Sequence, residues 1–212
     1  MKNLVIIGTG GFAREVYWLA RKSVGFDKEY TVKGFVEGDA PVSEERLQLL
    51  SGPFFGRLPD YDIEPDDVFV IAIADSQVKE KLAKLVTDKG GRFTNVIAES
   101  AFVAPTAELG TDIVLCQNTF VSDHVSIGNH VVINVASGVG HDSCIGDYSS
   151  LMGGVSICGG VQVGSYTYWG TGSIALPHSR IGNHANVGTN SLVLRKVKNG
   201  RTVFGSPAVY ID

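Results

Sequence analysis

The most constraining feature of this sequence is a six-residue repeat that fills its second half. Steps of six from Val103 reach sixteen positions without one inserted residue, and fourteen of them are Val, Leu or Ile. Neither an amphipathic helix nor an alternating strand has this period, whereas a coil of very short strands joined by tight corners does. One repeat cannot bury its apolar residue alone, so we expect successive coils to stack into a continuous core.

Small residues surround each apolar position. The residue two places before it is nearly always small or β-branched, as at Ser137, Ser143 and Ser149. Glycine often follows it, at positions 110, 128, 140, 146, 164, 170, 182 and 188. We expect these glycines at the corners because glycine adopts backbone angles that other residues resist. A β-sandwich would show varied strand and loop lengths, so the even spacing favours the coil.

The first half instead alternates strand and helix patterns. Apolar runs at 3–8, 30–37 and 68–74 predict strands, and helical spacing predicts helices at 11–22 and 75–91. Asp75 is a candidate helix cap, and Gly90 a candidate stop. The segment RFTNVI follows at 92–97. This order predicts a small parallel α/β unit, with a domain boundary between residues 98 and 99.

Composition narrows the partners and the compartment. The 212 residues carry a net charge of −4 without a Lys/Arg cluster, so neither nucleic acid nor an anionic membrane is expected as a partner. No apolar run approaches the roughly 18 residues of a membrane span, and no leader cleavage site follows MKNLVIIG. We therefore expect a cytoplasmic protein. Cys116, Cys144 and Cys158 lack metal-type spacing, so they are predicted to be reduced thiols.

The repeats IGNHVV, IGDYSS, VGSYTY, IGNHAN and VGTNSL resemble the hexapeptide-repeat acyltransferases. VIIGTGGFAREV, VEGD and VFVIAIADS resemble the N-terminal domain of bacterial sugar acetyltransferases, in the branch with sialic acid O-acetyltransferases and UDP-amino-sugar and GDP-perosamine N-acetyltransferases. The resemblance implies a Rossmann-like nucleotide-sugar-binding domain at 1–98 and a left-handed parallel β-helix at 99–212, assembled as a homotrimer. It also implies three hexads per coil, which places His141 between Asp123 and Gly159.

His141 and Asp142, in GVGHDSCIGD, lie off the apolar repeat and are the candidate catalytic pair. Acetyl transfer from a thioester to a sugar amine or hydroxyl needs a base for the acceptor's proton, and imidazole titrates near neutrality. A neighbouring carboxylate fixes the tautomer of the ring and raises its basicity. The family motif gives the two residues these roles, and we expect backbone N–H groups of the glycine-rich coil to hold the oxyanion. Asn134 matches an Asn that often accompanies the motif.

The remaining histidines are expected to be structural residues in corners, namely His124, His130, His178 and His184. The resemblance further implies acetyl-CoA as co-substrate, lying along the outside of the helix between two subunits. Residues carried over to face it are Ser150, Gly159, Thr171 and Thr189. The tail VFGSPAVYI resembles the segment that closes over the pantetheine arm. No metal is expected.

The glycine turn GTGGFA fits the dinucleotide pattern G-x-G-x-x-G/A, after a strand and before a helix. Backbone N–H groups of Gly10, Gly11 and Phe12 at a helix N-terminus predict an anion site, and Glu37 could accept from hydroxyls or a uracil edge. Family likeness implies that this domain holds the nucleotide of a nucleotide-linked sugar instead of NAD. Gly38 and Ala74 would then line the pocket.

These observations favour an acetyl-CoA-dependent sugar acetyltransferase that N-acetylates a nucleotide-linked amino sugar. An O-acetyltransferase acting on sialic acid or another sugar hydroxyl remains open. A zinc lyase like the carbonic anhydrases that share this β-helix would need three His ligands, two of them close together. An NAD-dependent oxidoreductase would need a second catalytic domain, which the sequence does not indicate. In an inert binding module, His141 would have no catalytic role.

Overall fold

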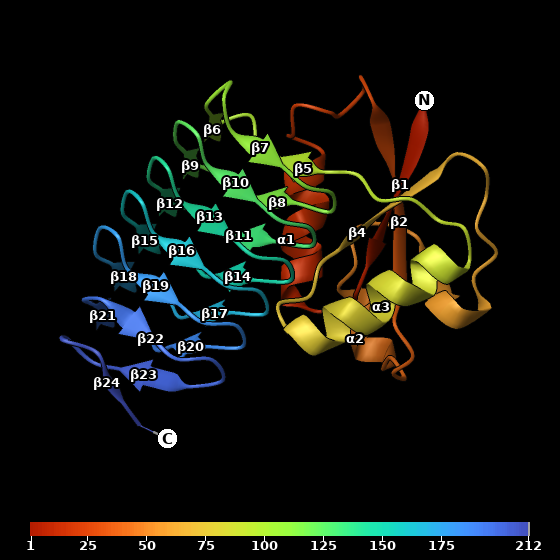
Figure 1. Ribbon diagram of the computed structural model, residues 1–212. Coiled ribbons are helices and arrows are strands. Elements are labelled where there is room, and N and C mark those ends of the chain that lie inside the picture. Colours follow the sequence, from red (N-terminus) through yellow and green to blue (C-terminus); the bar gives the residue numbers. More distant parts are fainter. Residues whose placement is uncertain (212) are drawn as a thin grey trace. The chain divides into compact units, whose positions relative to one another are not determined.

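The computed structural model describes residues 1–211, and the chain divides into two compact units, Met1–Glu99 and Ser100–Asp212. The first unit is an α/β domain whose four-stranded parallel sheet has the order β3-β2-β1-β4 (Figure 1). Its strands are β1 (Lys2–Ile7), β2 (Tyr30–Glu37), β3 (Phe54–Arg57) and β4 (Asp67–Ile71), followed by the short β5 (Val96–Ile97). Its helices are α1 (Gly11–Ala20), α2 (Glu44–Gln48) and α3 (Ser76–Asp88), with a 3₁₀ turn η1 at Leu58–Asp60.

Local chemistry explains where the helices of this unit begin. Asp75 caps α3, because its Oδ1 accepts from the backbone N–H groups of Gln77 and Val78 at 3.0 and 2.9 Å. Ser43 caps α2 in the same way through the N–H of Arg46 at 3.3 Å. The sequence predicts the first cap but does not define the region of α2 and β3.

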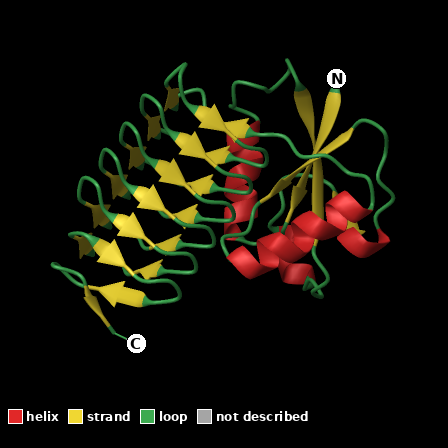
Figure 2. Ribbon diagram, viewed as in Figure 1, coloured by secondary structure: helices red, strands yellow, loops and turns green. Residues whose placement is uncertain are grey.

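The second unit is a left-handed parallel β-helix with three faces, built from two-residue strands apart from the three-residue β23 (Figures 1 and 2). The first face contains β6 (Phe102–Val103), β9 (Phe120–Val121), β12 (Gly138–Val139), β15 (Ser156–Ile157), β18 (Ile174–Ala175) and β21 (Leu192–Val193). The second contains β7 (Glu108–Leu109), β10 (Ser126–Ile127), β13 (Cys144–Ile145), β16 (Gln162–Val163), β19 (Arg180–Ile181) and β22 (Lys196–Val197). The third contains β8 (Val114–Leu115), β11 (Val132–Ile133), β14 (Ser150–Leu151), β17 (Tyr168–Trp169), β20 (Asn186–Val187), β23 (Thr202–Phe204) and β24 (Val209–Tyr210).

The register confirms the predicted repeat. Residues eighteen apart pair across adjacent coils, as in Gly138 with Ser156, and the predicted apolar series from Leu115 to Val193 is buried along the axis of the helix. The last coil is two residues shorter, because Arg180 pairs with Lys196. This shortening explains why the six-residue series stops at Val193.

The glycines after the apolar residues serve a different purpose from the one we expected. Their φ angles are not positive; the next coil approaches so closely that a β-carbon on Gly128 would lie 2.8 Å from the backbone nitrogen of Asp147. The left-handed conformation falls two residues later, at positions such as Asp112, His130 and Asp142. Steric room for the neighbouring coil, and not backbone freedom, therefore selects these glycines.

Within residues 1–211, no helix combines the length and the apolar character that crossing a membrane requires.

Candidate active site

His141 and Asp142 form a hydrogen-bonded pair at the corner between β12 and β13. The Nδ1 of His141 lies 2.7 Å from Oδ2 of Asp142, and both side chains are about two-thirds exposed, at 66% and 68%. A carboxylate can only accept at this contact, so it selects the tautomer with the proton on Nδ1. Nε2 is then left with a free lone pair in solvent.

The free nitrogen lies over the next coil. A β-carbon on Gly159 would be 2.6 Å from Nε2 of His141 and 2.7 Å from Cε1, so the ring occupies the space that any larger residue would need. Asp142 lies beside Asp123 of the preceding coil, through an N–H to O=C bond of 3.1 Å. His141 therefore lies between Asp123 and Gly159, as the register predicts.

Ser143 links the coil of the pair to the next coil. Its buried hydroxyl donates to the carbonyl of Cys158 at 2.9 Å and accepts from the N–H of Val161 at 3.0 Å. These two bonds fix the distance along the helix axis between the coil of His141 and the coil of Gly159. The small residues of the repeat thus serve as links between coils as well as fillers of the interior.

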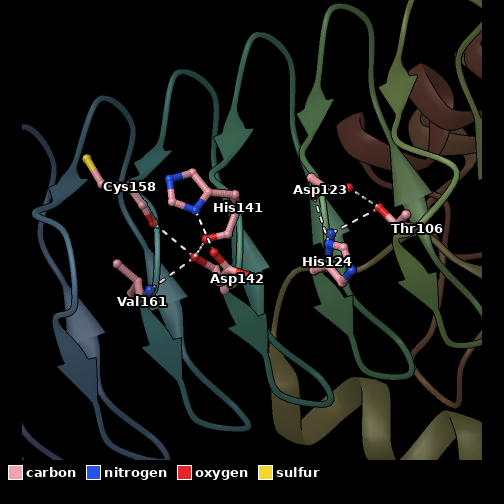
Figure 3. A network of polar contacts seen from close by, with 8 residues as sticks. Thr106, Asp123, His124, His141, Asp142, Cys158 and Val161 are labelled. Atoms are coloured by element: carbon pink, nitrogen blue, oxygen red, sulfur yellow. Dashed lines mark hydrogen bonds and ion pairs between the residues drawn. The ribbon is translucent and has the colours of Figure 1, made fainter.

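A second Asp–His pair lies one coil before the first, in the reverse order (Figure 3). His124 Nδ1 lies 2.8 Å from Asp123 Oδ2, and Thr106 donates to the other oxygen of Asp123 at 2.5 Å. The hydrogen bond that His124 donates to the Asp123 carboxylate raises the pKa of His124 above its usual value. The bonds from Thr106 and then from His124 lower the pKa of Asp123. The figure shows the two pairs leaning apart, Asp123 toward Thr106 and His141 toward the coil of Cys158.

The remaining predicted site residues of the β-helix do not gather around His141 within one chain. Asn134 lies at the corner after β11, where its Oδ1 accepts from the N–H of Val135 at 2.6 Å. Thr171 and Thr189 are stacked at the corners after β17 and β20. Ser150 lies in β14 and is only 1% exposed. Only Gly159 of the four expected cofactor contacts shares the corner of His141.

A basic hollow lies on the second face of the β-helix, toward its C-terminal end. It measures about 610 Å³, and its lining includes three cations, Arg180, Lys196 and Lys198, together with Cys144 and Gln162. In the described part of the chain, none of these three cationic groups has an ion-pair partner. The sequence alone does not reveal this cluster, because its members come from separate coils.

The first unit holds a smaller hollow of about 320 Å³ at the start of α1. Gly10 and Gly11 line it as expected, together with Thr9, Arg14 and Arg46, which sequence patterns did not indicate. Phe12, Glu37, Gly38 and Ala74 are not among its lining residues. The uncapped N-terminus of α1 and two arginines make this hollow suitable for an anion.

Glu37 is bound within the protein. It is 7% exposed, and its oxygens accept from Thr9 Oγ1 at 2.5 Å and from the N–H of Gly38 at 2.8 Å. Arg46 lies 3.9 Å from the same carboxylate. Glu37 therefore holds the glycine turn and Arg46 in place.

Across residues 1–211, no group of three or more His, Cys, Asp or Glu side chains is arranged to hold a metal ion. His130, for example, pairs instead with the buried Asp112 at 2.8 Å and stacks on Tyr148.

Comparison with known proteins shows what this chain is similar to. The PglD N-terminal domain matches residues 3–86. A GDP-perosamine N-acetyltransferase from Caulobacter crescentus, solved with CoA and GDP-perosamine as a variant that has alanine in place of a histidine, is 27% identical with a TM-score of 0.89, over 100% of this chain and 98% of that one. WeeI from Acinetobacter baumannii is 28% identical with a TM-score of 0.87 over 100% of both chains.

The fold is that of the hexapeptide-repeat acyltransferases. The chain matches the PglD N-terminal domain over residues 3–86, and over its whole length it is similar in fold to the GDP-perosamine N-acetyltransferase and to WeeI. The acetyltransferase domain of PglB from Neisseria gonorrhoeae shares the fold, at 21% identity and a TM-score of 0.87 over 100% of both chains.

A more distant likeness comes from curated proteins. An acyl-[acyl-carrier-protein]–UDP-N-acetylglucosamine O-acyltransferase from Pseudomonas putida is 32% identical over 83 residues, which cover 39% of this chain. The chain spans about a third of the length of these curated relatives, at 32%.

Proposed function

We propose that this protein transfers an acetyl group from acetyl-CoA to the amine of a nucleotide-linked amino sugar, with His141 as general base. The observation that carries the proposal is the 2.7 Å bond between His141 and Asp142, which leaves Nε2 free above Gly159. A base in this state is ready to accept a proton without prior ionisation.

The proposed reaction uses this geometry. The acceptor nitrogen attacks the thioester carbonyl carbon while Nε2 of His141 takes its proton, and the carbonyl electrons move to oxygen. Asp142 stabilises the imidazolium that forms. Collapse of the oxyanion then breaks the C–S bond, and the departing sulfur takes the proton from His141. The products are the N-acetylated sugar and free CoA, and the enzyme returns to its starting state.

The donor and acceptor assignments have separate support. The basic hollow with Arg180, Lys196 and Lys198 complements the phosphate groups of CoA, and the Caulobacter enzyme was solved with CoA. The hollow at Gly10 and Gly11 suits the diphosphate of a nucleotide sugar, and the same relative was solved with GDP-perosamine.

A homotrimer would explain why the expected cofactor contacts lie at different corners of the β-helix. Gly159 and the two threonines lie at different corners of one chain, so a donor that touches all of them must lie between two copies. The active protein would then consist of three chains, each contributing His141 to one groove and Thr171 and Thr189 to the next.

The direct test supplies acetyl-CoA together with UDP-, GDP- and dTDP-linked amino sugars and detects the gain of one acetyl group by mass. We expect one of these amino sugars to be acetylated, and His141→Ala to lower kcat by about 10²–10⁴-fold. Undiminished transfer by the variant would refute the base. The curated relatives are O-acyltransferases, so nucleotide sugars carrying only hydroxyls form the second arm. Products in that arm alone would favour an O-acetyltransferase.

A further inference from the structure

Two imidazoles lie on either side of the glycine pair at the catalytic corner. Three successive coils contribute His141–Asp142, Gly159–Gly160 and Pro177–His178. Backbone bonds fix this order: the N–H of Gly160 donates to the carbonyl of His141 at 2.7 Å, and the N–H of His178 donates to the carbonyl of Gly159 at 3.0 Å. His178 therefore lies one coil beyond the glycine pair, and His141 one coil before it.

Both rings lean over the glycines. A β-carbon on Gly159 would be 2.6 Å from Nε2 of His141, and one on Gly160 would be 2.5 Å from Nδ1 of His178. Because the two glycines are adjacent, Nε2 of His141 and Nδ1 of His178 approach neighbouring residues that have no side chains. His141 approaches from the preceding coil and His178 from the following one. Any side chain at either glycine would enter this space.

His178 differs from the rest of the histidines in having no partner. His124 and His141 are bonded to carboxylates, His130 is bonded to Asp112, and His184 stacks on Tyr166. In the part of the chain that the structure describes, His178 has no hydrogen bond, ion pair or ring contact through its side chain, and it is exposed. Its N–H is therefore available to a ligand.

We propose, building on the proposed acetyl transfer, that His178 is a second catalytic residue and donates a hydrogen bond to the thioester carbonyl oxygen of the donor. The attacked carbon must lie next to the acceptor nitrogen, and hence next to Nε2 of His141 above Gly159. The N–H of Gly160 is already bonded within the coil ladder and does not serve the oxyanion, so of the two backbone N–H groups in the glycine pair only that of Gly159 is left for it. The ring of His178 supplies a second donor, from the coil on the other side of the glycine pair.

This role needs no proton transfer by His178. The imidazole keeps its proton while negative charge grows on the carbonyl oxygen, and the hydrogen bond strengthens as the oxyanion forms. Removing one such donor typically lowers kcat by about 10²–10³-fold, since its main effect is on the transition state. We expect the KM for acetyl-CoA to change much less than kcat.

The test compares His178→Asn with a matched control, His184→Asn. Both histidines are exposed corner residues with positive φ, 62° and 56°, and the chain already places Asn in this conformation at Asn118 and Asn190. Both variants should therefore fold, and His184→Asn should lose a little melting temperature because it gives up the stacking on Tyr166. We expect His178→Asn to lower kcat by at least about tenfold and His184→Asn to leave kcat unchanged. Equal kcat values for His178→Asn and the wild type would overturn the proposal.

An infrared measurement separates this proposal from the identity of the acceptor. In the absence of any sugar, the carbonyl stretch of bound ¹³C-labelled acetyl-CoA should move to lower frequency in the wild type and in His184→Asn. It should lie at the solution value in His178→Asn. An unshifted band in the wild type would refute the hydrogen bond, even if transfer to an amino sugar is observed. A shifted band without any acetylated sugar would instead refute the proposed acceptor alone.

Discussion

At the scale of single residues, the site depends on a glycine that makes room for an imidazole. The nearest atoms to a β-carbon on Gly159 belong to the ring of His141, and its own φ is not in the left-handed region. Gly159→Ala should therefore leave stability nearly unchanged, because the exposed ring can rotate away. The same rotation removes the base from its position, so we expect kcat for acetyl transfer to fall by roughly tenfold or more. Calorimetry and steady-state kinetics on the same preparation measure both effects.

Gly128→Ala is the contrasting variant for this prediction. Its β-carbon would meet the backbone nitrogen of Asp147 at 2.8 Å, and a backbone atom in the stacked coils has no room to move. We expect a clear loss of melting temperature at this position. If Gly159→Ala were destabilised as much as Gly128→Ala, the clash at 159 would not be confined to a mobile ring.

The Asp123–His124 pair predicts a pH dependence. His124 has a raised pKa in the folded protein, chiefly through its bond to Asp123, so its stabilisation is complete below the usual value of 6.5 and is lost as pH rises through the raised value. Asp123 has a lowered pKa, so its stabilisation is present above 3.8 and is lost as pH falls through the lowered value. The pair therefore stabilises the fold most between pH 3.8 and pH 6.5, where both contributions are present.

NMR titration of the imidazole measures this directly. We expect Asp123→Asn to lower the pKa of His124. The Asp142 carboxylate of the next coil also favours the charged ring, but more weakly than the bonded partner. Asp142→Asn should accordingly shift the His124 pKa less than Asp123→Asn does. A larger shift from Asp142→Asn would mean that the two pairs interact more closely than the bonds indicate.

At the scale of elements, the second face of the β-helix concentrates positive charge at one end. Arg180 of β19 and Lys196 of β22 are paired neighbours, so two cations face the same side of adjacent strands. Like charges at this spacing repel, which favours an anionic ligand between them. We expect the double variant Arg180→Gln with Lys196→Gln to raise the KM for acetyl-CoA by roughly tenfold, because charge-assisted bonds to phosphate are lost.

A shorter acetyl donor tests whether the lost phosphate contacts cause the higher KM. Acetyl-pantetheine carries the same thioester without phosphate groups, so its KM should be the same for the double variant and the wild type. Lys28→Gln, which removes a charge from the first unit, serves as the control. If the KM for acetyl-pantetheine rose as much as the KM for acetyl-CoA, the double variant would be damaging the catalytic corner and not a phosphate site.

The elements also show what sequence alone can and cannot specify. The six-residue series determines the inward residues, because a coil that buries one aliphatic side chain per face leaves no other register. The same spacing of eighteen residues also predicts that His178 lies one coil above Gly160. It does not predict that the ring points toward Gly160, because this depends on the side-chain rotamer. Glu37 shows a different gap: its pattern predicts a ligand contact, which stays a prediction, but does not indicate that Thr9 and Gly38 bind its carboxylate. Arg14 and Arg46 were missed because they reach one hollow from two separate helices.

At the scale of the whole molecule, the first face of the β-helix points to self-association. Its outward residues include a stacked pair of large apolar rings, Phe102 and Phe120, whose centroids lie 5.2 Å apart. They are 53% and 48% exposed, and Ile174 adds further apolar surface on the same face. Exposed apolar side chains gathered on one face favour burial against another surface. Three chains that turn this face toward a common three-fold axis would bury all of these side chains.

Phe120→Asp tests the trimer and its part in the reaction together. We expect the wild type to sediment as three chains of 22.6 kDa and the variant as one, because a carboxylate on the face buried in the trimer would lose its hydration. Acetyl transfer should fall with the trimer, since Thr171 and Thr189 would no longer lie opposite His141. Ser126→Asp adds the same charge to another face and should leave the mass unchanged. A monomeric variant with full activity would show that one chain forms the whole site by itself.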